Sequence, residues 1–265
     1  MEIAFLILLF IIGSCFGSFL CCQARRLRLK STKKGSKKLG SRSVCLHCYY
    51  QLKWYDNIPI ISWLLLRGKC RKCHQKIGVA EIISELSAGI AFLAFGAQFV
   101  FATAVPLDWL AFVFILLLSL VLIFLAIYDG LYGELPTLYL IVAIILAVLV
   151  SAIKQIILSQ TTGFTPESIY QPLLAVLILG GLYFALYFIS KGKWVGDGDW
   201  LLGIAIGLAL GSPWLALIAL FVANLLACLF ALPTLKKSKK IHLGPFLVAS
   251  FVITSTFADF LQSML

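Results

Sequence analysis

Long apolar runs, separated by short polar segments, follow one another along most of the chain. Most of these runs approach the ~20 residues that a helix needs to cross the hydrocarbon core of a bilayer. The pattern predicts eight membrane-spanning helices, at residues 3–22, 80–103, 109–128, 136–153, 172–190, 199–211, 214–232 and 243–262. The sixth run is short for a full crossing, so we expect it to tilt, to begin inside the protein or to be partly re-entrant.

The composition excludes most other classes of protein. Of the 265 residues, 62% are hydrophobic and 12% are charged, and the mean hydropathy is +1.02. Soluble domains are about 45–50% apolar and about 25% charged, so these values exclude soluble, fibrous, disordered and disulfide-scaffold chains. We expect an all-α polytopic membrane protein in three parts: a first helix at 1–22, a basic loop at 23–79 and a membrane domain at 80–265.

The basic residues indicate how the helices are oriented. Lys and Arg number 22 against 11 Asp and Glu, and 15 of the 22 lie in the loop 23–79. With eight crossings and the amino terminus outside, 21 of the 22 lie on one side, which the positive-inside tendency makes cytoplasmic. The stretch 25–43 is expected to be a flexible tether attracted to anionic membrane lipids, and no nucleic-acid partner is expected.

Two CxxC pairs in this loop indicate a metal site. Cys45 and Cys48 form the first pair, Cys70 and Cys73 form the second, and 21 residues separate them. This spacing is typical of a four-thiolate zinc knuckle or ribbon, and a reducing cytosol favours metal over disulfides. Since four thiolates complete a tetrahedron, we predict a structural zinc ion with no open position for water. Paired disulfides and an unliganded thiol tetrad remain alternatives.

Three acidic residues lie where predicted spans meet the cytoplasm, and acidic groups near hydrocarbon are candidates for function. Asp129 ends the third span, and Asp197 and Asp199 lie in a Gly-Asp-Gly-Asp turn at the start of the sixth. The topology places Asp129 and this turn on one face at one depth. Glu81 and Glu85 open the second span, where the helix dipole accounts for them.

Two carboxylates in a partly desolvated site do not both ionise easily, so one holds a proton while the other activates water, as in an aspartic protease. Gly196 and Gly198 allow the turn to approach an extended peptide closely. From the residues alone, an ion or proton pathway and structural helix caps remain alternatives to a protease.

The ordered set of motifs resembles the type IV prepilin peptidases, bacterial members of the GxGD aspartyl protease group. The matching residues are Gly17-Ser-Phe-Leu20, Arg26, the cysteine pairs, Trp54 to Trp63, Leu66 to Cys70, Asp129, Leu135-Pro136 and Gly196 to Asp199. The resemblance implies that Asp129 and Asp199 are the catalytic pair, with Asp197 in the variable position of GxGD. Departures from the family pattern, none of which removes a catalytic carboxylate, occur at Cys21, Arg28, Leu46 and Thr137.

The resemblance also implies an activity. Such enzymes cleave the short basic leader of prepilins or pseudopilins after a glycine, and longer members then N-methylate the new amino terminus with S-adenosylmethionine. We therefore expect an aspartic endopeptidase of the bacterial plasma (inner) membrane, with its main loop in the cytoplasm and methylation as an expected second step. No glycine-rich nucleotide loop follows a strand, so residues that bind this cofactor are unknown from the sequence.

Two functions of other classes are compatible with the same residues. One is a zinc-stabilised membrane transporter or assembly protein that uses the acidic residues to move ions or protons. The other is a methyltransferase alone, acting on an amino terminus that has already been processed.

Overall fold

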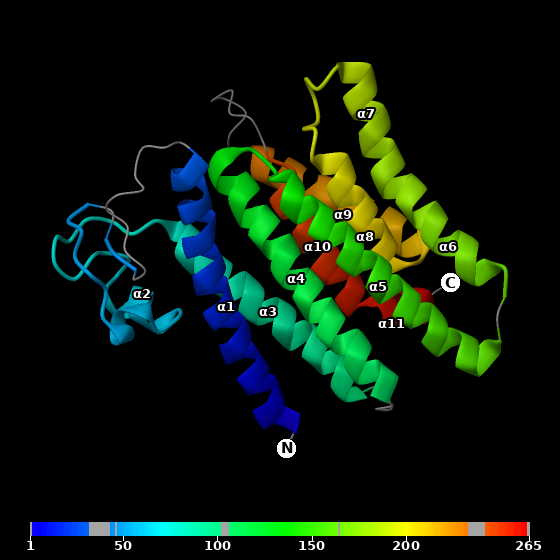
Figure 1. Ribbon diagram of the computed structural model, residues 1–265, viewed down its shortest axis with the longest axis horizontal. Coiled ribbons are helices and arrows are strands. Elements are labelled where there is room, and N and C mark those ends of the chain that lie inside the picture. The colour runs from blue at the N-terminus through cyan, green and yellow to red at the C-terminus, as the bar shows by residue number, and fades with distance from the viewer. Residues whose placement is uncertain are drawn as a thin grey trace. The chain divides into compact units, whose positions relative to one another are not determined.

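The computed structural model is built almost entirely of helices (Figure 1). It describes residues 2–31, 43–45, 47–101, 106–163, 165–232 and 242–263. Within these ranges no β-strand forms, and the only extended pairings are the isolated bridges between Val44 and Gln51 and between Lys69 and Lys76. The predicted all-α fold is confirmed.

The chain divides into two compact units, Met1–Gly96 and Ala97–Leu265. The first unit contains α1 (Glu2–Ser31), η1 (Trp54–Asn57), α2 (Ile61–Leu65) and most of α3 (Val79–Phe101). The second unit contains α4 (Pro106–Tyr132), α5 (Thr137–Thr162), α6 (Glu167–Val176), η2 (Leu177–Gly181), α7 (Leu182–Ser190), α8 (Asp199–Leu210), α9 (Pro213–Ala231), α10 (Gly244–Thr256) and α11 (Ala258–Ser263).

Six helical segments of the described chain are long and apolar enough to cross a membrane. They are Glu2–Leu29, Val79–Val100, Pro106–Tyr132, Thr137–Gln160, Glu167–Ser190 and Pro213–Ala231. The two other expected spans correspond to shorter apolar helices, α8 with 12 residues and α10 with 13. The sequence already indicated that α8 is short, whereas α10 is shorter than expected: it ends at Thr256, and the rest of the predicted span forms α11 after a break at Phe257.

The first helix is longer than predicted. α1 continues to Ser31, beyond the expected end at residue 22. Residues 23–31 contain no Gly or Pro and are rich in Arg, Leu and Lys, which are good helix formers. Ala24 is fully buried, so packing also supports the extension. The rest of the expected tether, residues 32–42, and the basic segment 233–241 lie outside the described residues.

Small residues allow α1 and α3 to pack closely in the first unit. Gly13 and Gly17 are four residues apart on one face of α1, the spacing that brings membrane helices together. A Cβ atom at Gly13 would lie 2.5 Å from the carbonyl oxygen of Ala88, and one at Gly89 would lie 2.5 Å from Ser14 Oγ. These two helices frame the cysteine segment, which joins them in sequence.

In the second unit, α8 packs against α5, α6, η2 and α10, and α4 packs against α5 and α10. Added Cβ atoms at Gly203 and Gly207 would lie 3.0 Å and 2.8 Å from the carbonyl oxygens of Leu179 and Ala175, so backbones touch along this face. Figure 1 shows that α4 ends at the same end of this unit at which α8 and α10 begin. The expected aspartates are at these helix ends.

Candidate functional site

Asp129 lies one turn before the end of α4 and is 6% exposed. The helix ends at Tyr132 because Gly133 turns the chain with a φ of +68°, while its N–H still donates to the carbonyl of Asp129 at 2.7 Å. The Asp129 carboxylate accepts a hydrogen bond on Oδ2 from the backbone N–H of Gly244, at 3.0 Å. His242 Nδ1 lies 3.7 Å from the other oxygen, Oδ1.

Asp199 is the first residue of α8 and is also 6% exposed. Its Oδ2 accepts the backbone N–H of Gly196 at 2.8 Å, which closes the Gly-Asp-Gly-Asp turn. Asp197, in the same turn, is exposed. The two carboxylates therefore have similar surroundings: that of Asp129, from the end of α4, lies at the start of α10, and that of Asp199 lies at the start of α8. Unpaired N–H groups and the helix dipole favour a negative charge at the start of a helix.

The turn brings Asp199 toward the end of α4. A Cβ atom at Gly198 would lie 2.6 Å from Leu135 Cβ, so only glycine allows this approach to the connection that follows α4. Asp129 and Asp199 are close enough for their charges to interact. Two buried carboxylates at such range favour a state in which the pair retains one proton. This arrangement suits acid–base chemistry on a bound peptide.

His242 and Gly244 were missed by the sequence reasoning. Both contact the Asp129 carboxylate from the segment that leads into α10. A signal was present, because the predicted topology places the start of the last span on the same membrane face as Asp129. The hydropathy pattern, however, does not indicate that the backbone N–H of Gly244 binds Asp129, which lies 115 residues earlier in the chain.

The four cysteines expected to bind metal come together in the first unit. All four Sγ atoms lie within 4.8 Å of one another. Cys45 Sγ is 3.8 Å from Cys73 Sγ, and Cys48 Sγ is 4.0 Å from Cys70 Sγ. Each of these two contacts joins a cysteine of the first CxxC pair to a cysteine of the second. The four thiols can therefore hold one metal ion.

The two CxxC turns have the same local geometry. In the first, the Cys45 carbonyl accepts the N–H of Tyr49 at 2.9 Å, and in the second the Cys70 carbonyl accepts the N–H of His74 at 3.0 Å. Tyr49 and His74 both have φ of 56°. Backbone N–H groups of Cys73 and Lys72 lower the pKa of the Cys70 thiol to about 7, which favours the thiolate that metals bind.

Two buried carboxylates anchor the cysteine segment. Asp56 accepts the N–H of Lys53 at 3.1 Å and the Arg71 guanidinium at 2.8 Å. Glu85, 6% exposed on α3, accepts the N–H of Ile60 at 2.7 Å. Ile60 has φ of +63°, which is strained for a β-branched residue. The Glu85 contact therefore holds a strained turn against α3, a role that the helix-dipole interpretation did not predict.

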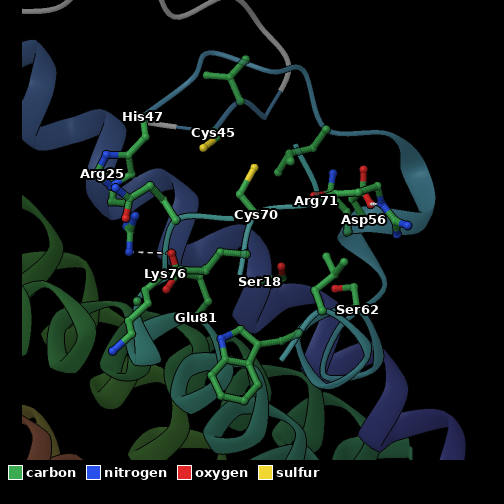
Figure 2. A pocket seen from close by; sticks show the side chains of 18 of the residues that line it. Ser18, Arg25, Cys45, His47, Asp56, Ser62, Cys70, Arg71, Lys76 and Glu81 are labelled. Atoms are coloured by element: carbon green, nitrogen blue, oxygen red, sulfur yellow. Dashed lines mark hydrogen bonds and ion pairs between the residues drawn. The ribbon is translucent and has the colours of Figure 1, made fainter. Parts of the chain in front are cut away.

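A cavity of about 290 Å³ lies beneath the cysteines, within the first unit (Figure 2). Figure 2 shows Cys45 and Cys70 on one side of it, the Asp56–Arg71 pair on a second and Arg25 with Glu81 on a third. Arg25 Nη2 is 2.5 Å from Glu81 Oε1. Apart from the cysteines, the sequence singled out none of these lining residues as ligand-binding, because α1, α3 and the cysteine segment contribute them separately.

Comparison with known proteins identifies the family. The Bacterial Peptidase A24 N-terminal domain matches residues 11–99. A prepilin leader peptidase/N-methyltransferase of Vibrio cholerae is 32% identical over 260 residues, 96% of this chain and 97% of the relative. The protein of the same name from Klebsiella pneumoniae is 33% identical over 213 residues, 79% of this chain and 86% of the relative. No solved structure matches this chain. The chain therefore belongs to the prepilin leader peptidase/N-methyltransferase family, as its motifs indicated.

Proposed function

We propose that this protein removes the leader from prepilins or pseudopilins, with Asp129 and Asp199 as its catalytic pair. One observation carries the proposal: two buried carboxylates lie within charge range at one end of the second unit, each held by a backbone N–H. Membership of the family supplies the substrate class. The peptidase activity belongs to the predicted membrane domain at 80–265.

The chemistry follows from the shared proton. The ionised carboxylate takes a proton from a water molecule, whose oxygen attacks the scissile carbonyl carbon. The protonated carboxyl gives its proton to the leaving amine as the C–N bond breaks, so no covalent intermediate forms. Because the two carboxyl groups titrate as a pair, the roles of base and acid are assigned to the pair and not to one residue each. The Gly196–Gly198 turn holds Asp199 in place, because Gly198 packs against Leu135 and the N–H of Gly196 donates to the Asp199 carboxylate.

The substrate is proposed to approach along the membrane. Its apolar segment lies in the bilayer of the bacterial inner membrane, and its basic leader lies at the cytoplasmic face, where the predicted topology places the main loop and both aspartates. The positively charged loop contacts anionic lipids and has no role in nucleic-acid binding. This orientation is the one that the distribution of 22 basic residues favours.

The four cysteines are proposed to hold one structural zinc ion. Zn–S bonds of about 2.3 Å place the sulfurs of a tetrahedral site about 3.8 Å apart, and the two measured Sγ distances are 3.8 and 4.0 Å. Four thiolates leave no position for a substrate or a catalytic water. The ion stabilises the cysteine segment without taking part in cleavage.

The second activity in the family name is proposed to occur in this chain as well. S-adenosylmethionine, when bound, supplies a methyl group that the new α-amine of the processed pilin accepts. The cavity of the first unit fits such a cofactor because its wall holds two buried polar atoms, Glu81 Oε2 and Trp63 Nε1, that have no hydrogen-bond partner among the described residues. Arg25, Glu81 and Trp63 are the residues proposed to hold it.

Intact-mass spectrometry of a model prepilin tests both steps. The substrate carries a basic leader that ends in Gly before Phe, and it is incubated with membranes that contain wild-type protein or the Asp129→Asn variant. We expect a cut after the glycine and the added mass of one methyl group with wild type, and no cut with the variant. Cleavage that persists in Asp129→Asn would contradict the catalytic assignment, and a cut without added mass would contradict methylation.

A further inference from the structure

Four large apolar side chains of the cysteine segment are exposed, although they lie outside the six long apolar helices. Leu64 and Leu65 of α2 are 57% and 78% exposed, Ile61 at the start of α2 is 54% exposed, and Trp54 of η1 is 79% exposed. Because η1 packs against α2, the four residues belong to one part of the segment, and together they are called the α2 patch. A protein surface in water rarely gathers large apolar groups in this way.

The opposite side of α2 is held in place by contacts within the first unit. Ser62, Trp63 and Leu66 line the cavity beneath the cysteines, and Figure 2 shows Ser62 on the side of this cavity opposite His47. A Cβ atom at Gly68 would lie 2.9 Å from the Trp63 ring, so glycine allows the chain to close over the indole. One side of α2 therefore faces the cavity, and the other side is left exposed.

The hydrogen bond between Ile60 and Glu85 sets the level of α2 along the membrane helices. Ile60 directly precedes α2, and its N–H donates to Glu85 at 2.7 Å. Glu85 is six residues beyond Val79, the first residue of α3, which is about 9 Å along the helix axis. On α1, a Cβ atom at Gly17 would lie 2.8 Å from Glu85 Cα. The apolar run of α1 continues from Gly17 to residue 22, for about 7–8 Å. Both helices thus place the start of α2 about 7–9 Å inside the apolar layer.

This level is that of an amphipathic helix lying in a membrane interface. Such helices bury their apolar side about 5–10 Å into the boundary between headgroups and acyl chains. In Figure 1, α2 is level with the middle part of α1 and does not lie beyond the Ser31 end of that helix. Tryptophan is enriched in the same zone of a membrane, which accounts for the exposure of Trp54. The exposed side of α2 is therefore placed where lipid replaces water.

The charge around the patch discriminates between possible partners. Residues 53–76 contain six basic residues and one acidic residue, Asp56, which is buried and paired. Arg67 and Lys69, which follow α2, are exposed. Anionic lipid headgroups attract such cations, whereas a basic leader peptide or a second copy of this segment would be repelled. A membrane with anionic lipids is therefore the partner that fits both the apolar and the charged residues.

We propose that the α2 patch inserts into the lipid interface and anchors the cysteine segment to the membrane surface. The aliphatic side chains of α2 enter the acyl boundary, Trp54 lies at the level of the headgroups, and Arg67 and Lys69 extend to lipid phosphates. This anchor depends neither on the catalytic assignment nor on methylation. It differs from the attraction of the basic tether to lipids because it requires apolar contact. The cysteine segment is then attached to the membrane through α2 as well as through α1 and α3.

Site-specific photocrosslinking to lipid tests the proposal on the full-length protein in vesicles of phosphatidylethanolamine and phosphatidylglycerol. The photoreactive residue p-benzoylphenylalanine replaces Leu65, Ile83 or Gln51 in three separate proteins, and mass spectrometry quantifies the lipid adducts after irradiation. Ile83 is exposed on the spanning helix α3 and is the positive control. Gln51 is an exposed polar residue of the cysteine segment and is the negative control. We expect the yield of adducts at position 65 to be close to that at position 83 and well above that at position 51.

A charged residue in the patch supplies a matched perturbation. With Leu64→Asp, the photoreactive residue at position 65 is expected to lose most of its lipid adducts, because a carboxylate resists entry into hydrocarbon and is repelled by phosphatidylglycerol. Gln51→Asp adds the same charge elsewhere in the segment and is expected to leave the adducts unchanged. The thermal midpoint of each variant establishes that it is folded. Equal adduct yields in Leu64→Asp and Gln51→Asp would contradict insertion of α2.

Quenching of tryptophan emission by brominated lipids is a second measurement that needs no charge and no photoreactive group. Such lipids quench the tryptophans that they contact, so Trp54→Phe is expected to have a smaller quenchable share of its emission than wild type. An unchanged quenchable share would contradict the placement of Trp54.

Three crosslinking results would overturn the proposal. Adducts at position 65 that are no more abundant than those at position 51 would show that the patch lies in water. Crosslinks from position 65 to residues 97–265 of the same chain would show that the second unit covers the patch. Crosslinks between two chains would assign the patch to self-association.

Discussion

Gly244→Ala is expected to impair catalysis through the position of one carboxylate. Gly244 is the first residue of α10, and its N–H donates to Asp129 Oδ2. A Cβ atom there would lie 2.7 Å from that oxygen and 3.2 Å from Asp129 Cβ and Cγ. To reach an ordinary contact of 3.4 Å, the carboxylate must retreat by about 0.7 Å.

A displacement of this size is large for a catalytic group. A misplacement of about 1 Å can cost about 10²-fold in rate, so we expect cleavage by Gly244→Ala to be about 10- to 100-fold slower than by wild type. Stability should change less, because the helix propensity of alanine exceeds that of glycine by about 1 kcal/mol and offsets part of the steric cost. The charges of the site are unchanged.

The assay is the initial rate of leader removal from a model prepilin per folded enzyme molecule. Gly130→Ala is the matched control, since Gly130 follows Asp129 in α4 and its added Cβ would meet only Pro245 Cγ at 3.6 Å. This control should cleave at close to the wild-type rate. A Gly244→Ala enzyme as fast as the control would refute the view that the Gly244 contact positions Asp129 for catalysis.

Three further predictions concern the first unit. Cys70→Ser should abolish stoichiometric zinc in elemental analysis and make the cysteine segment protease-sensitive. Cys228→Ser, which lies outside the cluster, should do neither, and equal zinc content in the two variants would exclude the cysteine site. Gly13→Ala should lower the free energy of unfolding by about 1–3 kcal/mol through overpacking of α1 on α3, and an unchanged thermal midpoint would contradict that packing. Arg71→Gln should make the cysteine segment easier to cleave in limited proteolysis, because the buried Asp56 carboxylate loses its charged side-chain partner. Proteolysis that is unaffected would argue against this ion pair as an anchor.

The sequence predicted those parts of the architecture that depend on the hydrophobic pattern and on the spacing of the cysteines. The apolar runs identified the membrane helices and the short α8, and the CxxC spacing correctly predicted that four sulfurs converge. The end of α1 was predicted too early because basic residues end an apolar run without ending a helix. The π-turn η2, inside the fifth predicted span, has no signal in hydropathy because it changes backbone hydrogen bonding rather than composition.

Contacts between distant segments could not be predicted in the same way. Periodicity assigned Glu81 and Glu85 to the start of a helix, but their partners Arg25 and Ile60 come from α1 and from the cysteine segment. Similarly, the backbone donor to Asp129 is supplied by Gly244, a residue with no side chain to suggest a role. Such contacts depend on tertiary packing, which a single sequence does not encode as a local pattern.

Catalysis by Asp129 and Asp199 acting as one pair is tested most directly by leader cleavage in matched asparagine variants. Asp199→Asn should slow cleavage by about 10²- to 10⁴-fold, whereas Asp197→Asn, two residues away and exposed, should remain within about twofold of wild type. The double variant Asp129→Asn/Asp199→Asn should be no slower than either single variant, since residues that act as a unit are not additive. Cleavage at the wild-type rate by Asp199→Asn, or equal losses for Asp197→Asn and Asp199→Asn, would contradict the paired mechanism.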